Sequence, residues 1–582
     1  MTEVLVGEYL FRRLKQVGVQ TVFGVPGDFE LALLNLVPEQ GLSWVGTPNE
    51  LVGAYAADGY AREKGFGALV TTFGPGELSA LCGIGGAFCE NVPVLHIVGY
   101  PTRPVQASGR IIHHTLGDLR YDHYVKMSGE LSCATAVLED THTAASKIDR
   151  VINAMLLQSK PGYIGISEDV AYSKIPLSYL ETKLVTSPPQ GNMDIEQKAI
   201  SAICKALTES KKPILLVDGG ASRGSWEKLV PELIDTLAIP VFTTTLGKGI
   251  VDESGPYYIG GYEGLVSLPE VKEIVEGADC VLWLGSLPSD FNTWAVARFK
   301  ERSLQLRTRQ IRDTKFEAKI SHILPRLTKA IGTEKPLSGK MSQVKRPERP
   351  AVPMPKAIEQ DWLWPRLSAY IKPGDLVVTE TGTSQFGFNM TTLPRGAKVW
   401  TQAVYGSIGY AAGAAAGASI AARETGTYKR VILITGEGSL QLTVQAFSIL
   451  NRHGLTPVVF IINNLGYTVE RYFNGMEAAY NDVPMWDYGA IFQAMSPETR
   501  IKSFKVDKAA DLDALLSDEN FQTATYPQAS GTSSESDRLT RRLKCVDMIL
   551  GPKDLPSNLK KMFETVKAGA ATKSSGTSHS VE

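Results

Sequence analysis

Two oxygen-bearing side chains each stand directly after a short apolar run in the last third of the sequence. Glu437 follows the run at 431–436 (VILITG), and Asn464 follows the run at 457–463 (PVVFIIN), twenty-seven residues after Glu437. That spacing leaves room for one helical crossover between two parallel strands, whose carboxyl ends form the ligand-binding edge of such a sheet. Carboxylate and amide oxygens suit Mg²⁺, which completes its shell with phosphate oxygens. The pattern predicts a Mg²⁺ site.

The residues around Glu437 also favour a diphosphate. Gly436 and Gly438 let backbone amides approach phosphate closely, and a helix expected to begin near Ser439 adds the positive end of its dipole. We therefore expect a metal-bound diphosphate at this edge.

Five apolar runs that end in glycine indicate the elements that position these residues. A β-branched run followed by a glycine turn and a helix is typical of a parallel α/β sheet. The repetition along the whole chain predicts an α/β protein with three doubly wound parallel-sheet domains. The runs are VFGVPGD (22–28), LVTTFGPGE (69–77), ILLVDGG (214–220), VLWLGS (281–286) and VILITGEG (431–438).

Two proline-rich stretches divide the chain. Lys183–Asp194 and Lys335–Pro355 combine prolines with polar residues, and such segments resist packing. The predicted units are an N-terminal domain at 1–182, a central domain at 195–334, a C-terminal domain at 356–565, and a disordered tail at 566–582.

Composition excludes several classes of protein. Sixty basic and 61 acidic residues give a net charge of −1, so no global field attracts nucleic acid or an anionic membrane. The longest weakly polar stretch, Gly406–Ala422, is too short to span a bilayer. The N-terminus lacks a signal-peptide layout. Six cysteines without paired spacing read as reduced thiols, which predicts a cytoplasmic protein. From the balanced charge and the lack of a spanning stretch, we expect no nucleic-acid or membrane partner.

Taken together, these motifs resemble a known family. G-E-G-S followed by N-N-x-G-Y is similar to the metal–diphosphate signature of thiamine diphosphate enzymes, which is normally G-D-G-S…N-N. Further matching segments follow in the order of fungal pyruvate decarboxylases and related 2-oxo acid decarboxylases, over about Glu3 to Glu564. They are VFGVPGDFE (22–30), TPNELVGAYAADGYAR (47–62), TTFGPGELSA (71–80), the pair His113-His114, SDFNTW (289–294), ETGTSQFG (380–387), GSIGYAAGA (406–414) and GYTVE (466–470).

The resemblance implies thiamine diphosphate and Mg²⁺ as cofactors, bound in the C-terminal domain. It implies Glu437, Asn464 and Gly466 as the metal ligands. Glu437 stands where the family has Asp, and the extra methylene leads us to expect weaker metal binding. The residues implied to contact the cofactor are Thr383, Gly406, Ser407, Ile408, Gly436, Gly438, Ser439 and Tyr467.

The resemblance also implies five catalytic residues. Glu50 would hydrogen-bond the pyrimidine ring of the cofactor, and Asp28, His113, His114 and Glu470 would relay protons. From the residues alone, simpler interpretations stay open. Glu50 could equally be a solvent-exposed acid at the start of a helix, and Asp28 could be a helix cap. Adjacent histidines are also common in ordinary polar loops.

The expected substrate pocket includes Phe291, Gln385 and Val469. Gln385 would reduce the space for a large substrate and Val469 would enlarge it slightly, which favours pyruvate. Decarboxylation of aromatic or branched 2-oxo acids is the alternative. Gly220 and Ala221 stand where yeast enzymes carry an activating cysteine, so activation through a thiol there is not expected.

The family resemblance further implies a homodimer or homotetramer in which one chain's C-terminal domain meets another chain's N-terminal domain. A non-catalytic paralogue with impaired cofactor binding is a second hypothesis, against which the retained candidate catalytic residues argue. A nicotinamide dehydrogenase is disfavoured because no glycine turn gives G-x-G-x-x-G followed by an acid. A phosphate-loop nucleotidase is disfavoured because the sequence lacks G-x-x-x-x-G-K-[ST].

Overall fold

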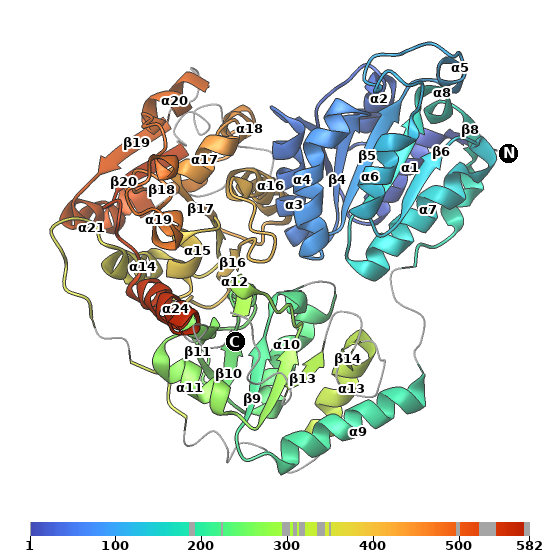
Figure 1. Cartoon of the computed structure of the whole chain (residues 1–582). Coiled ribbons are helices and arrows are strands. Elements are labelled where there is room, and N and C mark those ends of the chain that lie inside the picture. The colour runs from blue at the N-terminus through green and yellow to red at the C-terminus, as the bar shows by residue number, and fades with distance from the viewer. Residues whose placement is uncertain are drawn as a thin grey trace, which may run out of the picture.

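The computed structural model describes three six-stranded sheets, each covered by helices on both faces (Figure 1). The predicted fold class is therefore confirmed. The residues described are 2–185, 192–222, 225–293, 303–306, 311–312, 320–333, 344–348, 351–495, 501–522 and 543–575.

The first sheet is wholly parallel, and most of its strands are buried on both faces, as expected from their apolar runs. A short antiparallel pair, β1 (Glu3–Leu5) with β8 (Lys174–Pro176), lies beside it. In sheet order the strands are β3 (Ser43–Gly46), β2 (Thr21–Gly24), β4 (Gly67–Thr72), β5 (Val94–Tyr100), β7 (Gly162–Ser167) and β6 (Thr135–Leu138). The main helices are α1 (Val6–Gln16), α2 (Leu31–Glu39), α3 (Glu50–Lys64), α4 (Pro75–Cys89), α6 (Asp122–Glu130) and α7 (Thr141–Gln158).

The second sheet is parallel except for its last strand, which pairs antiparallel to its neighbour. In sheet order the strands are β11 (Tyr258–Gly261), β10 (Val241–Thr243), β9 (Pro213–Val217), β12 (Cys280–Leu284), β13 (Ser303–Leu306) and β14 (Ile311–Arg312). The main helices are α9 (Met193–Glu209), α10 (Val230–Leu237), α11 (Pro269–Gly277), α12 (Asp290–Thr293) and α13 (Ile320–Thr333).

The third sheet is parallel throughout. In sheet order its strands are β16 (Lys398–Trp400), β15 (Asp375–Thr379), β17 (Arg430–Gly436), β18 (Val458–Asn463), β20 (Leu543–Ile549) and β19 (Ile501–Val506). The main helices are α14 (Gln360–Tyr370), α15 (Thr383–Phe388), α16 (Tyr410–Thr425), α17 (Glu437–Thr443), α18 (Ala446–Arg452), α19 (Thr468–Phe473), α20 (Tyr488–Met495), α21 (Ala509–Ser517) and α24 (Ser557–Ser575).

The first and third sheets have the same connectivity. Numbered within each domain, both have the strand order 2-1-3-4-6-5, whereas the middle sheet has the order 3-2-1-4-5-6. Helix α3 follows the second strand of the first domain, and α16 follows the second strand of the third domain. The two helices are therefore topological counterparts.

Helices α3 and α16 pack against each other and join the first and third domains (Figure 1). Small residues make this possible, because a Cβ on Gly417 would lie 1.8 Å from the carbonyl oxygen of Ala56, and a Cβ on Gly59 would lie 2.1 Å from that of Ala414. One hydrophobic cluster runs through both helices into both sheets. The two domains thus share a core.

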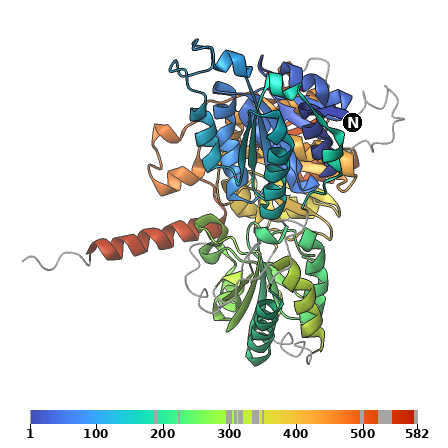
Figure 2. The same cartoon turned by 90° about the vertical axis from the view of Figure 1, so that its right-hand side faces the viewer.

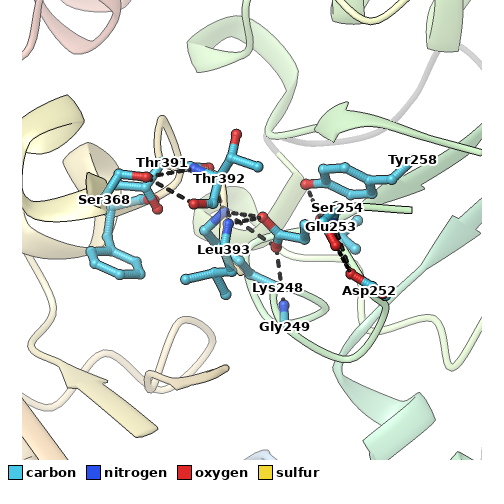
Figure 3. A network of polar contacts seen from close by, with 12 residues as sticks. Lys248, Gly249, Asp252, Glu253, Ser254, Tyr258, Ser368, Thr391, Thr392 and Leu393 are labelled. Atoms are coloured by element: carbon cyan, nitrogen blue, oxygen red, sulfur yellow. Dashed lines mark hydrogen bonds and ion pairs between the residues drawn. The ribbon is translucent and has the colours of Figure 1, made fainter. Parts of the chain in front are cut away.

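A buried ion pair within the middle domain also hydrogen-bonds to the third domain (Figure 3). Lys248 Nζ lies 3.0 Å from Oε2 of Glu253 and donates to the carbonyl oxygen of Thr391 at 2.7 Å. The same carboxylate accepts the backbone N–H of Gly249 at 3.2 Å and that of Leu393 at 2.9 Å. Thr391 and Leu393 follow α15, so this network fixes the chain beyond that helix.

The C-terminal helix α24 begins on the protein and then projects away from it (Figure 2). Near its start, Leu559, Met562 and Phe563 pack with Val266 and Phe386. The helix continues through Ser575, so the disordered tail expected from residue 566 does not begin there, and residues 576–582 lie outside the described part.

Each sheet lies inside one of the three ranges expected from the sequence. The boundaries 1–182, 195–334 and 356–565 themselves stay predictions, since the proposed linkers fall partly on residues 186–191, 334–343 and 349–350, which lie outside the described residues.

Candidate active site

The ends of two neighbouring strands bring the predicted metal ligands together. Strands β17 and β18 pair in parallel, with Gly436 opposite Ile462, so the residues that follow them emerge at the same edge. Glu437 opens α17, slightly before the expected helix start at Ser439. Its Oε1 accepts the backbone N–H of Gly466 at 2.6 Å, which closes the turn after β18 onto the carboxylate.

The side-chain amide of Asn464 completes this group. With its nitrogen facing the cluster, the amide donates to Gly466 O at 2.8 Å and to both Glu437 carboxylate oxygens at 3.2 Å, while its oxygen accepts from Thr468 Oγ1 at 2.7 Å. Turned over, the amide brings its oxygen to the same distances from those three oxygens. Neighbouring oxygens around Mg²⁺ lie about 2.9 Å apart, given metal–oxygen bonds of about 2.0–2.1 Å. The donor set therefore fits a Mg²⁺ ion.

Burial changes the acidity of Glu437. Removal of the carboxyl from water raises its pKa to about 7, and the N–H groups of Gly466 and Asn464 counteract only part of this effect. A carboxylate that is 1% exposed and lacks an ion-pair partner among the described residues is costly to ionise. A bound cation would compensate for that cost.

A cavity of about 330 Å³ opens directly over this oxygen cluster. Its volume lies in the usual range for small-molecule sites. The residues predicted from the sequence that line it are Phe291, Thr383, Ile408, Gly436, Glu437, Gly438, Ser439, Asn464, Gly466, Tyr467, Val469 and Glu470; Thr381, Gly382, Ser384, Phe386 and Thr468 also line it.

Three predicted contact residues do not line this cavity: Gln385, Gly406 and Ser407. Thr383, Ser384 and Phe386 of α15 face the cavity, whereas Gln385 is 1% exposed and its amide has no hydrogen-bond partner among the described residues. Successive helical side chains diverge by about 100°, which explains why Gln385 faces the interior. Gln385 therefore does not line this cavity of the single chain, and its role in narrowing the substrate pocket stays a prediction.

Ser407 is held away from the cavity by other contacts. Its hydroxyl lies 2.5 Å from the hydroxyl of Tyr55 on α3, and its backbone N–H donates to Oε1 of Gln402 at 2.9 Å. Gly406 takes a positive φ of 64°, which turns the chain so that Ile408 reaches the cavity edge.

Glu380 was not identified from the sequence, although it positions this segment. Its Oε2 accepts the backbone N–H groups of Gly409 at 3.1 Å and Ala411 at 3.2 Å, while Oε1 accepts that of Thr381 at 3.1 Å. Burial raises its pKa to about 7, and these three N–H donors oppose the rise. The acid thus ties the start of α15 to the start of α16. Its partners on α16 lie about thirty residues away in sequence, so no local pattern points to it.

The first domain brings Asp28, His113 and His114 together. Nε2 of His113 lies 2.9 Å from Oδ2 of Asp28, and the rings of His113 and His114 meet edge-on with centroids 4.7 Å apart. His114 has a φ of 72°, uncommon for a residue with a side chain, and its carbonyl oxygen accepts from Tyr124 Oη at 2.7 Å. Burial and the neighbouring His113 lower the pKa of His114.

Glu50 is the first residue of α3, after the cap residue Asn49, whose side chain accepts the N–H of Val52. Partial burial raises the pKa of the Glu50 carboxyl, as expected for an acid in an apolar pocket. Sequence reasoning missed a second acid nearby. Glu30 accepts the N–H of Gly27 at 2.5 Å, and burial raises its pKa to about 8, with the charges of Asp28 and Glu50 adding to the rise.

The candidate residues therefore form two separate groups within one chain. The cavity over Glu437 is lined by the third domain and by Phe291 of the middle domain, and no described residue of the first domain lines it. Glu50, Asp28, His113 and His114 all belong to the first domain. One group suits metal and diphosphate binding, and the other supplies groups suited to proton transfer.

Comparison with known proteins assigns this combination of fold and site to a class. Sequence profiles of the thiamine pyrophosphate enzymes match in order: the N-terminal TPP binding domain at residues 5–124, the central domain at 200–323 and the C-terminal TPP binding domain at 380–523. The chain belongs to the thiamine pyrophosphate enzyme family.

The curated relatives place the chain more narrowly. Pyruvate decarboxylase isozyme 3 of Saccharomyces cerevisiae is 40% identical over 532 residues, which cover 90% of this chain and 94% of the relative. Isozyme 1 of the same organism is 38% identical over 582 residues (98% and 99%), and the pyruvate decarboxylase of Aspergillus terreus is 40% identical over 526 residues (89% and 92%). The predicted membership in the thiamine diphosphate-dependent 2-oxo acid decarboxylase family is thereby confirmed.

No helix among the described residues combines the length and the apolar character that crossing a membrane requires.

Proposed function

We propose that this protein catalyses the Mg²⁺- and thiamine diphosphate-dependent, non-oxidative decarboxylation of a 2-oxo acid, with pyruvate giving acetaldehyde and CO₂ as the preferred reaction. The observation that carries the proposal is the convergence of Glu437, Asn464 and Gly466 oxygens beneath a cavity of about 330 Å³. The names of the relatives support pyruvate as substrate.

Different residues of the chain would bind the metal and the diphosphate. Glu437, Asn464 and Gly466 hold Mg²⁺, and the N-terminus of α17 at Gly438 and Ser439 binds the diphosphate. When bound, thiamine diphosphate supplies the carbon that attacks the keto group and the ring that accepts the electron pair left by CO₂.

The opposite side of the cavity is apolar. The rings of Phe291 and Phe386 meet edge-on at 5.6 Å, and Val469 packs in the same cluster. These residues exclude water where the carboxylate loses its charge, which strengthens electrostatic assistance at that step. Glu470 reaches the cavity beside them and moves a proton to or from the reacting group.

Glu50, Asp28, His113 and His114 would come from the first domain of a second chain, since no described first-domain residue lines the cavity of its own chain. Glu50 would orient the cofactor's pyrimidine, and the Asp28–histidine group would transfer protons to the product. The functional unit is then a homodimer, or a tetramer of two such dimers. A cytoplasmic location also belongs to this proposal, since the six cysteines have no paired spacing.

Aldehyde formation from a panel of 2-oxo acids, with and without Mg²⁺ and cofactor, tests the proposal. We expect the highest kcat/KM with pyruvate. A higher value with phenylpyruvate or a branched 2-oxo acid would identify a decarboxylase of bulkier substrates. No aldehyde from any substrate, with no cofactor binding at millimolar Mg²⁺, would identify a non-catalytic paralogue.

Complementation between two inactive variants tests the shared site. If Glu50 and Glu437 act in the same site but come from different chains, co-expressed E50Q and E437Q chains regain one complete site per mixed dimer. Random pairing then restores about a quarter of wild-type activity. If both residues serve a site within one chain, the mixture stays inactive.

A further inference from the structure

Asp28, His113 and His114 offer the donor set of a second kind of metal site. One ligand atom from each residue lies within 4.8 Å of the other two, and this is the one such group found in the described part of the chain. We propose that this trio binds a borderline divalent cation of the Zn²⁺ class, and that this binding inhibits the enzyme.

The donor chemistry separates this site from the Mg²⁺ site. Two imidazoles and one carboxylate match the ligands of Zn²⁺, whereas Mg²⁺ favours oxygen ligands and keeps much of its water. The cluster of Glu437, Asn464 and Gly466 offers only oxygen ligands when the oxygen of the Asn464 side-chain amide faces it. The two sites therefore prefer different cations.

The geometry requires little rearrangement. In a tetrahedral zinc site with bonds of about 2.0–2.1 Å, neighbouring ligand atoms lie about 3.3 Å apart. Asp28 Oδ2 and His113 Nε2 are already 2.9 Å apart. The Asp28 side chain is 53% exposed, so it can rotate to admit an ion, and a water molecule can complete the shell.

The surroundings hold the two imidazoles in place. The ring of Phe29 stacks on that of His113, with centroids 4.9 Å apart, and meets the ring of His114 edge-on, with centroids 6.2 Å apart. Phe73 contacts the ring of His114 at 5.9 Å, and the carbonyl oxygen of His114 is fixed by Tyr124. No described residue hydrogen-bonds to the ring nitrogens of His114, which leaves them available to a metal. A preorganised pair of imidazoles binds a cation at lower entropic cost than two free side chains.

Inhibition follows from occupation of these atoms and rests on the function proposed above. A metal bound to His113 and His114 blocks the nitrogens that would carry protons to and from the product. Because Mg²⁺ binds elsewhere, raising its concentration should not relieve the inhibition.

Zn²⁺ binding is measured by calorimetry on the full-length protein saturated with Mg²⁺ and thiamine diphosphate. We expect one Zn²⁺ per chain, with affinity reduced roughly tenfold or more in H113Q and in H114Q. The matched control is H123Q, because His123 also lies near a carboxylate, 2.5 Å from Asp118, but lacks a second imidazole. Co²⁺ in place of Zn²⁺ should give the visible absorption of a four-coordinate site in the wild type and in H123Q. H113Q and H114Q should lack this absorption.

Two results would overturn the proposal. One is Zn²⁺ binding that is absent from the wild type or unchanged in correctly folded H113Q and H114Q. The other is Zn²⁺ inhibition that a tenfold increase in Mg²⁺ abolishes, because this would place Zn²⁺ at Glu437. If the protein decarboxylates no 2-oxo acid, the proposed function fails, while calorimetry still tests the metal site.

Discussion

The backbone N–H of Gly466 donates to Oε1 of Glu437 at 2.6 Å and thereby joins the turn after β18 to the end of β17. The longer side chain of Glu, in place of the Asp expected from the family signature, reaches this amide directly. The turn that would bind the metal is therefore closed by the residue that departs from the signature.

Replacement of Glu437 tests its role in metal binding. E437Q removes the anionic ligand and should raise the Mg²⁺ concentration needed for half-maximal thiamine diphosphate binding by roughly tenfold or more. E437D should lower it, because the shorter carboxylate better suits the octahedral geometry that Mg²⁺ demands. Calorimetric titration of both variants measures this, and equal Mg²⁺ requirements in E437D and wild type would contradict the expected penalty for Glu.

Replacement of Glu380 tests whether this acid positions the cofactor segment. E380Q loses one acceptor for the N–H groups of Gly409, Ala411 and Thr381, so the start of α16 loosens beside the cavity. A lost hydrogen bond to a charged group is worth about 1.5–3 kcal/mol. We expect the dissociation constant of thiamine diphosphate to rise about tenfold or more, with kcat at saturating cofactor less affected. T425A, at the other end of α16, should leave cofactor affinity unchanged, and equal affinities in E380Q and wild type would refute the role.

The buried acid Glu263 predicts a pH dependence of stability. Oε2 of Glu263 accepts from Asn389 Nδ2 at 2.7 Å, yet burial raises the pKa of the carboxyl from 4.5 to about 8. Because the folded state then holds a proton that the unfolded state releases, the acid lowers the free energy of unfolding as pH rises from about 4.5 to 8. The loss is about 1.4 kcal/mol for each pH unit crossed in that interval.

E263Q removes this titration and keeps an acceptor for Asn389. The difference in apparent melting temperature, E263Q minus wild type, should increase between pH 5 and 8 and stay constant above pH 8. E209Q, which changes an exposed acid on α9, should show no such trend. A difference between E263Q and wild type that does not vary with pH would show that Glu263 ionises normally.

The contribution of the buried pair Lys248–Glu253 to stability can be tested at the junction between the middle and third domains (Figure 3). E253Q removes the charge that pairs with the Lys248 ammonium in an almost dry site, and removal of one partner of such a pair costs about 3–5 kcal/mol. We expect a lower apparent melting temperature and faster proteolysis near Leu393. The exposed-pair variant E209Q should melt within a degree or so of the wild type, since such pairs contribute about 0–1 kcal/mol. An unchanged melting temperature of E253Q would show that the charge of Glu253 contributes little to this junction.

The sequence predicted those parts of the structure that depend on local pattern. Glycine-terminated apolar runs identified strands in all three domains, and the spacing from Glu437 to Asn464 placed both residues at adjacent strand ends. This works because one right-handed crossover joins parallel neighbours in most such sheets. Asp28 and Glu50 also follow adjacent strands of the first sheet, a relationship that was not predicted from the sequence.

Features that depend on packing between distant segments were not predicted. Glu380 has partners on another helix, and Gln385 faces inward although its neighbours Ser384 and Phe386 face the cavity. The extension of α24 beyond residue 566 was missed because a polar, small-residue composition resembles that of a free tail. Motifs locate side chains along an element, whereas rotation of that element about its axis is set by contacts that no motif encodes.

Helices α3 and α16 occupy equivalent places in two sheets of identical connectivity, and they pack against each other within a single polypeptide. A side chain added at Gly59 or Gly417 would therefore force apart the two domains that carry the two groups of candidate site residues.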